Sequence, residues 1–171
     1  MSRPIDRHLV DQLVVEHLPV ALRVAKRLVG NADSAEDVMQ DALCRVLRHW
    51  KSYRGEAAFS TWMMQIVVNV AREHRRRSHE IHELTCDLAP VVTTDPLERL
   101  TVVELSEKVR AALDDLPDRQ REFAMLRFGE DLPAREIATI LQISEANVHS
   151  CVHLVRKRIA KTIGVDYVER E

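Results

Sequence analysis

The sequence is poor in the residues and patterns that build strands, turns and membrane spans. Its 171 residues include only four glycines and six prolines, and almost no stretch alternates apolar and polar side chains. No apolar run approaches the roughly 18 residues needed to span a bilayer, and the first residues contain no signal-peptide core. These absences disfavour a β-rich fold and membrane insertion, so we expect an all-α protein in the cytoplasm.

The sequence also has few cysteines and a small net charge. Cys44, Cys86 and Cys151 are odd in number and widely separated, which is typical of a reducing compartment and not of a disulfide scaffold. The formal charge is only −2, but it is distributed unevenly: +4 in residues 1–77, −6 in residues 78–115 and zero in residues 116–171. A free-standing duplex binder is usually basic throughout, so near neutrality predicts that DNA is reached with help from a larger assembly.

Signatures of catalysis and of cofactor binding are missing as well. We find no glycine-rich phosphate loop, no nucleophile elbow and no pair of acids in a plausible cleft, and therefore expect no enzyme and no cofactor. His79, His82 and Cys86 offer the one alternative, a helical enzyme that binds a metal through them. Their spacing is loose, and HEIH is one residue short of the HExxH pair that binds zinc, so we expect no metal site.

The most informative segment that is present is Tyr53–Arg77, YRGEAAFSTWMMQIVVNVAREHRRR. Ser60 or Thr61 is expected to cap a helix here. An apolar stripe follows at helical spacing, formed by Trp62, Met63, Ile66, Val67 and Val70. The opposite, polar stripe consists of Thr61, Gln65, Asn69, Arg72 and Arg76, with Arg75 and Arg77 beside it.

The polar stripe and the loop before it have the chemistry of a nucleic-acid surface. Amide and guanidinium groups can hold phosphates and read bases, and the loop places Tyr53, Arg54 and Phe59 next to them. Aromatic side chains of this kind stack on unpaired bases. The simpler alternative is that the arginine run only solvates a helix end, where cations suit the negative pole of the helix dipole.

Helices are also expected before this segment. Two amphipathic segments precede Gly30, one ending before Pro19 and one running from about Val20 to Val29. The next helix is expected to begin at Ser34 with a capping-box-like pattern. Its predicted buried stripe is Val38, Ala42, Leu43, Val46, Leu47 and Trp50. Its opposite face presents Asp37, Gln40, Asp41, Cys44 and Arg48.

The last third of the chain has the spacing of a helix-turn-helix. Periodicity is lost in residues 78–96, returns from Leu97, and leads to a helix from about Asp118 to Phe128. Pro133 opens a second helix that ends at Leu141, and Ser144 caps a third, which is expected to bury Val148, Val152, Val155 and Ile159. The major-groove face of that third helix would carry Ser144, Ala146, Asn147, His149, Ser150, His153, Arg156 and Lys157.

Three of these segments resemble, in order, the extracytoplasmic-function sigma factors of bacteria. Tyr53–Arg77 is similar to that family's promoter-melting region, whose usual form is close to FRGES-F-TWLYRIARN-A-D-LRR. Ser34–Trp50 resembles the family's AEDLVQE segment, which docks on the coiled coil of the RNA polymerase β′ subunit. Leu116–Ile163 resembles the family's carboxy-terminal helix-turn-helix, so the resemblance covers nearly the whole chain from about Leu9.

The resemblance implies two small helical domains with separate tasks. A sigma region 2 bundle (residues 5–79) and a sigma region 4 helix-turn-helix (residues 97–167) would be joined by a flexible acidic linker (residues 80–96). The implied partners are core RNA polymerase, through its β′ coiled coil and β flap, promoter DNA, and an anti-sigma factor. Polymerase docking would use Asp37, Gln40, Asp41 and Arg48. Contacts to the minus-ten element would use Tyr53, Arg54, Phe59, Thr61, Gln65, Asn69, Arg72, Arg75, Arg76 and Arg77.

The third helix, which would read the minus-thirty-five element, departs from the family pattern GTVKSRL-RARK-L. His149, Cys151 and Leu154 stand where the family has cations, while Arg156, Lys157, Arg158 and Lys161 remain for phosphate contacts. The alternative in the same broad class is a helix-turn-helix regulator that binds an operator without polymerase. The near-neutral charge and the aromatic loop count against it.

Overall fold

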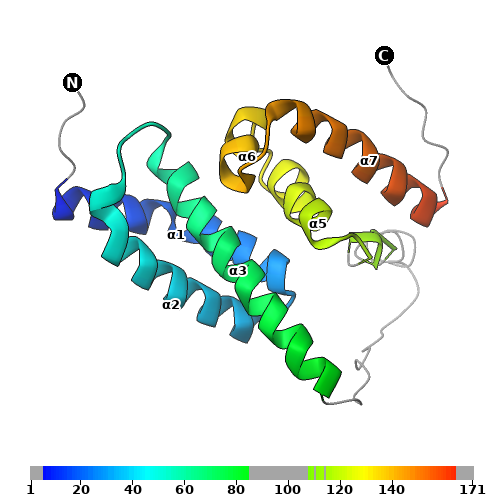
Figure 1. Cartoon of the computed structure of the whole chain (residues 1–171), viewed down its shortest axis with the longest axis horizontal. Coiled ribbons are helices and arrows are strands. Elements are labelled where there is room, and N and C mark those ends of the chain that lie inside the picture. Colours follow the sequence, from blue (N-terminus) through cyan, green and yellow to red (C-terminus); the bar gives the residue numbers. More distant parts are fainter. Residues whose placement is uncertain (1–5, 85–107, 110, 114, 165–171) are drawn as a thin grey trace, which may run out of the picture.

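The computed structural model describes residues 6–84, 108–109, 111–113 and 115–164, and every regular element among them is helical. The first half contains α1 (Arg7–Val29), α2 (Ala32–His49), the 3-10 turn η1 (Trp50–Ser52) and α3 (Phe59–Leu84). The second half contains α5 (Asp118–Ala124), the π-helical turn η2 (Met125–Gly129), α6 (Ala134–Leu141) and α7 (Glu145–Ile163) (Figure 1). The expected all-α class is confirmed for the described residues.

Helices α1, α2 and α3 pack on one another as a three-helix bundle (Figure 1). Its core is built largely from valine, alanine and methionine, which are small or adaptable enough to let the helices approach closely. Each fully buried valine contributes about 1.5–3 kcal/mol relative to an exposed one. The fully buried members include Val10, Val24, Val38, Val46, Met63, Val67 and Val68.

Helix α1 is continuous, so the predicted break before Pro19 is wrong. Proline cannot donate the intrahelical hydrogen bond that the carbonyl of Val15 would accept. Both Pro19 and Val15 are exposed, so water can bond that carbonyl instead. The second half of the helix is held in place by burial of Ala21, Val24 and Leu28 against the bundle.

The turn between α1 and α2 is shorter than predicted. Gly30 adopts the left-handed conformation (φ 84°) and its N–H donates to the Lys26 carbonyl, as expected for a helix end. Asn31 then caps α2, because its side-chain oxygen accepts from the Ser34 N–H at 2.8 Å. Ser34 therefore lies inside α2 and does not begin it.

Helix α3 also differs from its predicted limits. It begins at Phe59, so Ser60 and Thr61 lie within the helix and neither is its cap. It ends at Leu84, so the predicted loss of helix at Ser78 is wrong. The residues between Ser78 and Leu84 include no glycine or proline, and nothing local breaks the helix. The remainder of the predicted linker, residues 85–96, lies outside the described residues.

The helix-turn-helix forms as predicted, with one local change. Pro133 precedes α6, and Ser144 caps α7 by accepting from the Asn147 N–H at 3.2 Å. The first helix is α-helical only to Ala124 and then widens into the π turn η2. Its core is formed by Phe123, Leu126, Ile137, Ile140, Val148 and Val155.

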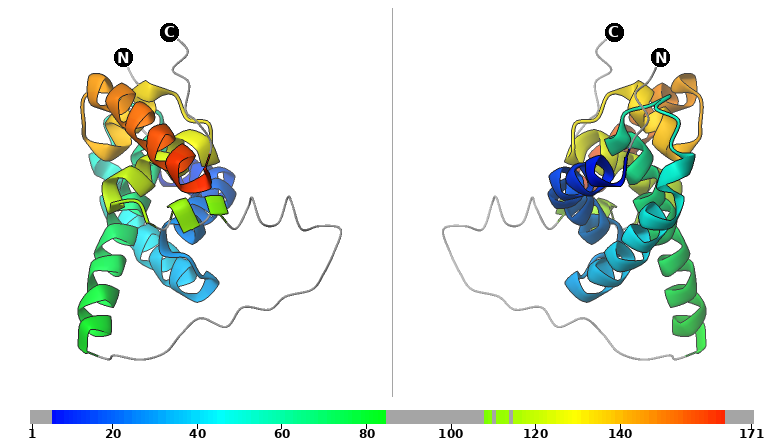
Figure 2. Two further views of the ribbon diagram at one scale, coloured as in Figure 1. Left: turned by 90° about the vertical axis from the view of Figure 1, so that its right-hand side faces the viewer. Right: turned by 90° about the vertical axis from the view of Figure 1, so that its left-hand side faces the viewer.

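The helix-turn-helix domain packs directly on the bundle. Helix α6 lies against α3, and η2 lies against α1, so buried residues of both halves join in one hydrophobic cluster. Both side views show the helix-turn-helix domain beside the upper part of the bundle, while the last turns of α3 project beyond the other described helices (Figure 2). This packing decides which polar faces remain open.

Candidate polymerase and nucleic-acid interfaces

The first part of the polar stripe of α3 faces the helix-turn-helix domain. Thr61 is 2 % exposed, and its hydroxyl donates to a Glu136 carboxylate oxygen of α6 at 3.4 Å. Gln65 and Asn69 are half-buried. The expectation that the whole stripe is exposed is therefore wrong at its start, because α6 covers the first turns of α3.

Arg72, in the middle of the stripe, makes the most extensive contact with the second domain. Its Nε and Nη2 atoms donate to the two oxygens of Glu122 on α5, at 2.8 and 2.7 Å, and its Nη1 donates to Asn69 Oδ1 at 3.2 Å. The Glu122 side chain is only 3 % exposed. Hydrogen bonding to Glu122 raises the pKa of Arg72 above its ordinary value, so the guanidinium stays charged.

Three more arginines of the bundle pair with acids of the helix-turn-helix domain. Arg75 donates to Asp118 at the start of α5. Arg23 and Arg27 on α1 both donate to Glu130, whose side chain is 7 % exposed. A Cβ on Gly129 would lie 2.6 Å from Arg27 Nη1, so the glycine leaves room for that guanidinium.

Sequence reasoning missed Arg23, Arg27, Glu122 and Glu130. They form pairs across 50 to 107 residues of chain. Periodicity reports only neighbours within a few helical turns, so it carries no signal for such pairs. The balanced charge of residues 116–171 gave only an indirect indication, because the nine acidic residues in that range had no predicted partner.

Aromatic side chains of the loop before α3 and of its first turn form a compact cluster. The Tyr53 ring centroid lies 5.5 Å from those of both Phe59 and Trp62, and the Tyr53 hydroxyl donates to the Ala57 carbonyl at 2.6 Å. Burial raises the pKa of the Tyr53 phenol. Phe59 is buried against His17, so the expectation that it offers an exposed face for a base is wrong. It belongs to the core.

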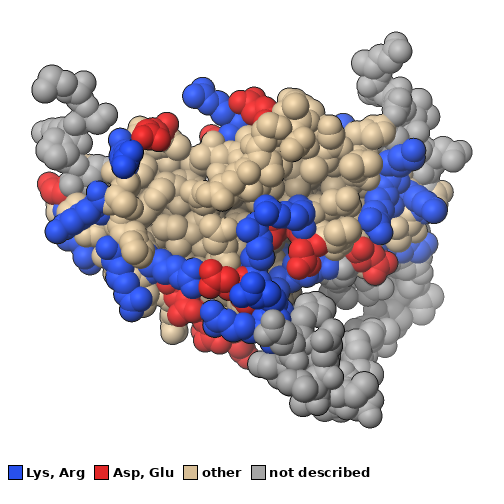
Figure 3. Space-filling view, in the orientation of Figure 1, with Lys and Arg blue, Asp and Glu red and all other residues tan. Residues whose placement is uncertain are grey.

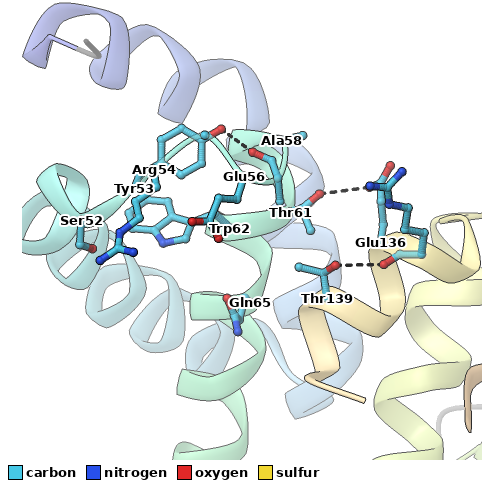
Figure 4. A pocket seen from close by; sticks show the side chains of 13 residues that line it. Ser52, Tyr53, Arg54, Glu56, Ala58, Thr61, Trp62, Gln65, Glu136 and Thr139 are labelled. Carbon is cyan, nitrogen blue, oxygen red and sulfur yellow. Dashed lines mark hydrogen bonds between the residues drawn. The ribbon is translucent and has the colours of Figure 1, made fainter. Parts of the chain in front are cut away.

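A hollow of about 840 Å³ opens between this loop and α6 (Figure 4). Tyr53, Arg54 and Gln65, all predicted to contact single-stranded DNA, line one side of it. Arg135, Glu136 and Thr139 of α6 line the other side. Tyr53, Arg54 and Gln65 therefore line the same hollow, and α6 of the second domain partly closes it.

The outer face of α2 is open. Asp37, Gln40, Asp41 and Arg48 are exposed, as the predicted polar face requires. Leu47 is 36 % exposed, so its predicted burial is wrong. It follows Gln40 by seven residues and Cys44 by three, which places it on the same face. An exposed leucine among charged residues is a second feature that sequence reasoning missed, although the spacing alone could have revealed it.

The end of the α3 stripe lies outside the interface between the domains. Arg76 is exposed, and Arg77 Nη2 lies 3.5 Å from a Glu73 oxygen. Glu73 also receives two hydrogen bonds from Arg45 of α2, at 2.8 and 2.6 Å, which lower the pKa of its carboxyl group. Lys and Arg side chains gather with acidic ones over the middle of α3 (Figure 3).

The outer face of α7 carries the predicted minus-thirty-five residues. Ser144, Ala146, Asn147, His149, Ser150, Arg156 and Lys157 are exposed, and His153 is half-buried. Arg156 lies over the Phe128 ring, 5.6 Å from its centroid. Leu154, which replaces a cation of the family pattern, is 50 % exposed. The face is thus accessible but has an apolar position where the family has a charge.

Neither a metal centre nor a membrane span is recognisable in the described part of the chain. Within it, no group of three or more His, Cys, Asp or Glu side chains is arranged to hold a metal ion. Cys86 lies outside the described residues, and the side chains of His79 and His82 are not among those described. Of the described helices, none is both long and apolar enough to cross a bilayer.

Comparison with known proteins identifies both halves. Residues 13–80 match the family model of sigma-70 region 2, and residues 106–159 match that of sigma-70 region 4. The ECF RNA polymerase sigma factor SigM of Mycobacterium tuberculosis is 31 % identical over 161 residues, covering 93 % of this chain and 79 % of SigM. The RNA polymerase sigma-H factor of Pseudomonas aeruginosa is 28 % identical over 169 residues, covering 92 % and 88 %.

Solved structures share the fold. Sigma factor RpoE of Bartonella quintana, crystallised with the anti-sigma factor NepR, superimposes with a TM-score of 0.70 at 23 % identity, covering 92 % of this chain and 98 % of RpoE. CnrH, in complex with the cytosolic domain of CnrY, gives a TM-score of 0.66 at 22 % identity, covering 95 % and 92 %. With its two matched regions and its relatives, this chain belongs to the extracytoplasmic-function RNA polymerase sigma factors, alternative sigma factors that bind core RNA polymerase and direct promoter-specific transcription initiation.

Proposed function

We propose that three surfaces of the chain bind polymerase, the minus-ten element and the minus-thirty-five element. The first is the outer face of α2, which docks on the β′ coiled coil of core polymerase. The observation that supports this most directly is the exposure of Asp37, Gln40 and Asp41 around the apolar Leu47. Interfaces commonly combine a desolvated apolar anchor with a charged rim that steers association. Arg48, at the end of the same face, completes that rim.

The second surface is the hollow beside α3 together with the stripe, and we assign it to the minus-ten element. Tyr53, Arg54, Gln65 and Asn69 would receive an unstacked base of the non-template strand. The backbone would be held by Thr61 at one end of the stripe and by Arg72, Arg75, Arg76 and Arg77 at the other. Aromatic and amide groups around one space support this assignment, because single-strand recognition relies on stacking and on polar contacts to base edges.

A melting role is tested with Asn69→Ala and Tyr53→Ala. Stacking contributes about 1–3 kcal/mol per base, so both variants are expected to reduce open-complex formation more than closed-complex binding. Permanganate reactivity of promoter thymines measures the open complex, and a gel shift of the holoenzyme measures binding. Thymine reactivity equal to that of the wild type would contradict the assignment.

The third surface is the outer face of α7, which we assign to the major groove of the minus-thirty-five element. Its exposed polar residues and its N-terminal cap have the arrangement of a recognition helix. The β flap of the polymerase would hold this domain in place. Because His149, Cys151 and Leu154 replace cations, we expect contacts from α7 to depend more on the polymerase than is usual for a basic recognition helix.

RpoE of Bartonella quintana is in a complex with the anti-sigma factor NepR, and we propose a partner of this kind for this chain. Family members are not enzymes, and we propose that this chain likewise catalyses nothing itself. We propose that it acts in the cytoplasm, where RNA polymerase is located.

One experiment tests the whole assignment. Run-off transcription with purified core polymerase is expected to yield a specific product only when this protein is added. Gel shifts in parallel are expected to show weak binding of duplex promoter DNA by the protein alone and tight binding by the holoenzyme. Tight, sequence-specific binding without polymerase would instead favour an operator-binding regulator.

A further inference from the structure

Two of the arginines assigned to promoter DNA are occupied by carboxylates of the chain's own second domain. Arg72 and Arg75 pair with Glu122 and Asp118, and Thr61 pairs with Glu136. We propose that Asp118, Glu122 and Glu136 occupy the places of promoter phosphates, and that together with Glu130 they form an acidic latch that keeps the minus-ten surface closed until polymerase engages. This inference rests on the proposed role of α3.

The geometry of the Arg72–Glu122 pair matches that of phosphate recognition. Two parallel N–H groups of one guanidinium meet two oxygens of one anion, which is how arginine binds both carboxylates and phosphates. The same N–H groups cannot serve both anions at once. Binding of DNA along the stripe and closure of the latch are therefore mutually exclusive.

Arg23 and Arg27 allow the contact that closes the domains to be changed without changing a residue assigned to DNA. They lie on α1, outside the set assigned to DNA, yet both hold Glu130. Glu130 follows η2 directly and is largely covered in the closed arrangement. This cluster therefore holds the domains together without contributing a predicted promoter contact.

The packing between the domains is that of a contact that can open. A second hollow, of about 390 Å³, lies in the interface and is lined by residues of both halves, among them His17, Met64, Glu130, Leu132 and Ile140. This hollow is open to solvent, so water reaches part of the boundary between the two domains. Ion pairs also join the two domains, and the pairs with an exposed partner weaken when salt or a competing anion is present.

The docking face of α2 stays exposed while the latch is closed. Polymerase can therefore bind the closed protein first. Removal of the second domain from α3, toward its own site on the polymerase, would then release Arg72 and Arg75 for DNA. The latch thus makes promoter contact conditional on polymerase binding, which would prevent the free protein from being trapped on DNA.

The sharpest test reverses the charge at Glu130 in the full-length chain. Glu130→Arg places three cations together and is expected to open the domains. A triple variant, Glu130→Arg with Arg23→Glu and Arg27→Glu, restores opposite charges and is expected to close them again. Glu145→Arg is the matched control, because it makes the same charge change at an exposed position at the start of α7.

Two readouts follow these variants. Energy transfer between dyes on Cys44 and on a cysteine introduced by Lys161→Cys, with Cys86 and Cys151 changed to serine, reports separation of the domains. Binding of single-stranded DNA of random sequence by the free protein reports access to α3. For Glu130→Arg we expect lower transfer and a DNA affinity about tenfold above that of Glu145→Arg, equivalent to about 1.4 kcal/mol. Both readouts should return toward the wild-type values in the triple variant.

The outcomes are separable from failure of the proposed function. Unchanged energy transfer in Glu130→Arg would overturn the latch, whatever Asn69→Ala does to promoter melting. If Glu130→Arg separated the domains but bound DNA no more tightly than Glu145→Arg, the latch and DNA would not compete for the same arginines. If Asn69→Ala then also left melting unchanged, the assignment of α3 to the minus-ten element would fail on its own measurement.

Discussion

The outer face of α2 and the polar stripe of α3 belong to adjacent helices of one bundle, yet they meet different surroundings. Asp37 and Asp41 on α2 are exposed, whereas Thr61 on α3 is buried and Arg72 is paired with Glu122. Both faces have the same amphipathic pattern in the sequence. Whether a functional face is available is therefore decided by what packs against it, and the helical pattern alone does not reveal it.

Charge explains which face is covered. The α2 face contains two acids, and the α3 stripe contains arginines. The second domain presents Asp118 and Glu122 to α3 and Glu130 to α1, so it is attracted to these two helices and would be repelled by the acids of α2. The same difference in sign keeps the proposed polymerase contact open while the proposed DNA contact is closed.

The largest expected effect comes from Arg72→Leu, which removes the cation from a carboxylate that is covered in the closed form. A buried charge left without its partner costs about 3–5 kcal/mol, so the domains should separate and expose Glu122 to water. A decrease in energy transfer between α2 and α7 would measure this separation. Arg76→Leu, at an exposed neighbouring position, should leave the transfer unchanged. A variant that stayed closed would show that Glu122 is not what holds α3.

The next effect concerns the open face. Asp37→Lys combined with Asp41→Lys should weaken binding to core polymerase by roughly tenfold to a hundredfold, about 1.4–2.8 kcal/mol, without changing the fold. Asp11→Lys with Glu16→Lys, two exposed acids on α1, gives the matched control. Affinity for core polymerase measures the effect, and full affinity in the first variant would contradict docking through α2.

A smaller effect is expected from Glu73→Gln, which breaks the link between α2 and α3 inside the bundle. Hydrogen bonding from Arg45 lowers the pKa of Glu73 below its ordinary 4.5. The pair therefore stabilises the fold fully above that ordinary value, and its contribution is lost as the pH falls through the lowered pKa. Both side chains are partly exposed, so the expected loss at neutral pH is about 0.5–1 kcal/mol.

Urea unfolding at neutral pH and at a pH below the lowered pKa measures this difference. The gap between Glu73→Gln and the wild type should close in acid. Glu16→Gln, an exposed carboxyl on α1, serves as the control. A gap of equal size at both pH values would assign the loss to packing and not to the ion pair.

The smallest effect is expected for Thr61→Val. The hydroxyl donates to Glu136 over 3.4 Å, a long hydrogen bond, and valine fills nearly the same volume. Loss of such a bond should shift domain closure by about 0.5 kcal/mol or less. Energy transfer close to that of the wild type would agree with this value. If Thr61→Val separated the domains as much as Arg72→Leu does, Thr61 would be the main contact between them. The hydrogen bond of Thr61 would then matter as much as the ion pair of Arg72.

Local features of the fold were largely predictable. Gly30 caps the end of α1 and Ser144 caps the start of α7, as the sequence indicates, because caps depend on the conformation and hydrogen bonds of a few adjacent residues. Local prediction failed where a distant segment intervened. Pro19 is tolerated because packing of the flanking turns holds α1 together, and Phe59 is withdrawn from the surface by contact with His17 of α1.

The sequence by itself determined the helices, the helix-turn-helix spacing and the motifs of the sigma factor family, because each is carried by residues within a few turns of one another. Only the tertiary structure decided that the α3 stripe is covered and the α2 face is open. That outcome depends on ion pairs such as Arg72 with Glu122 and Arg27 with Glu130, whose members are separated by 50 and 103 residues. Opposite charges attract through space, so no pattern along the chain specifies which of its 25 cations will meet which of its 27 acids.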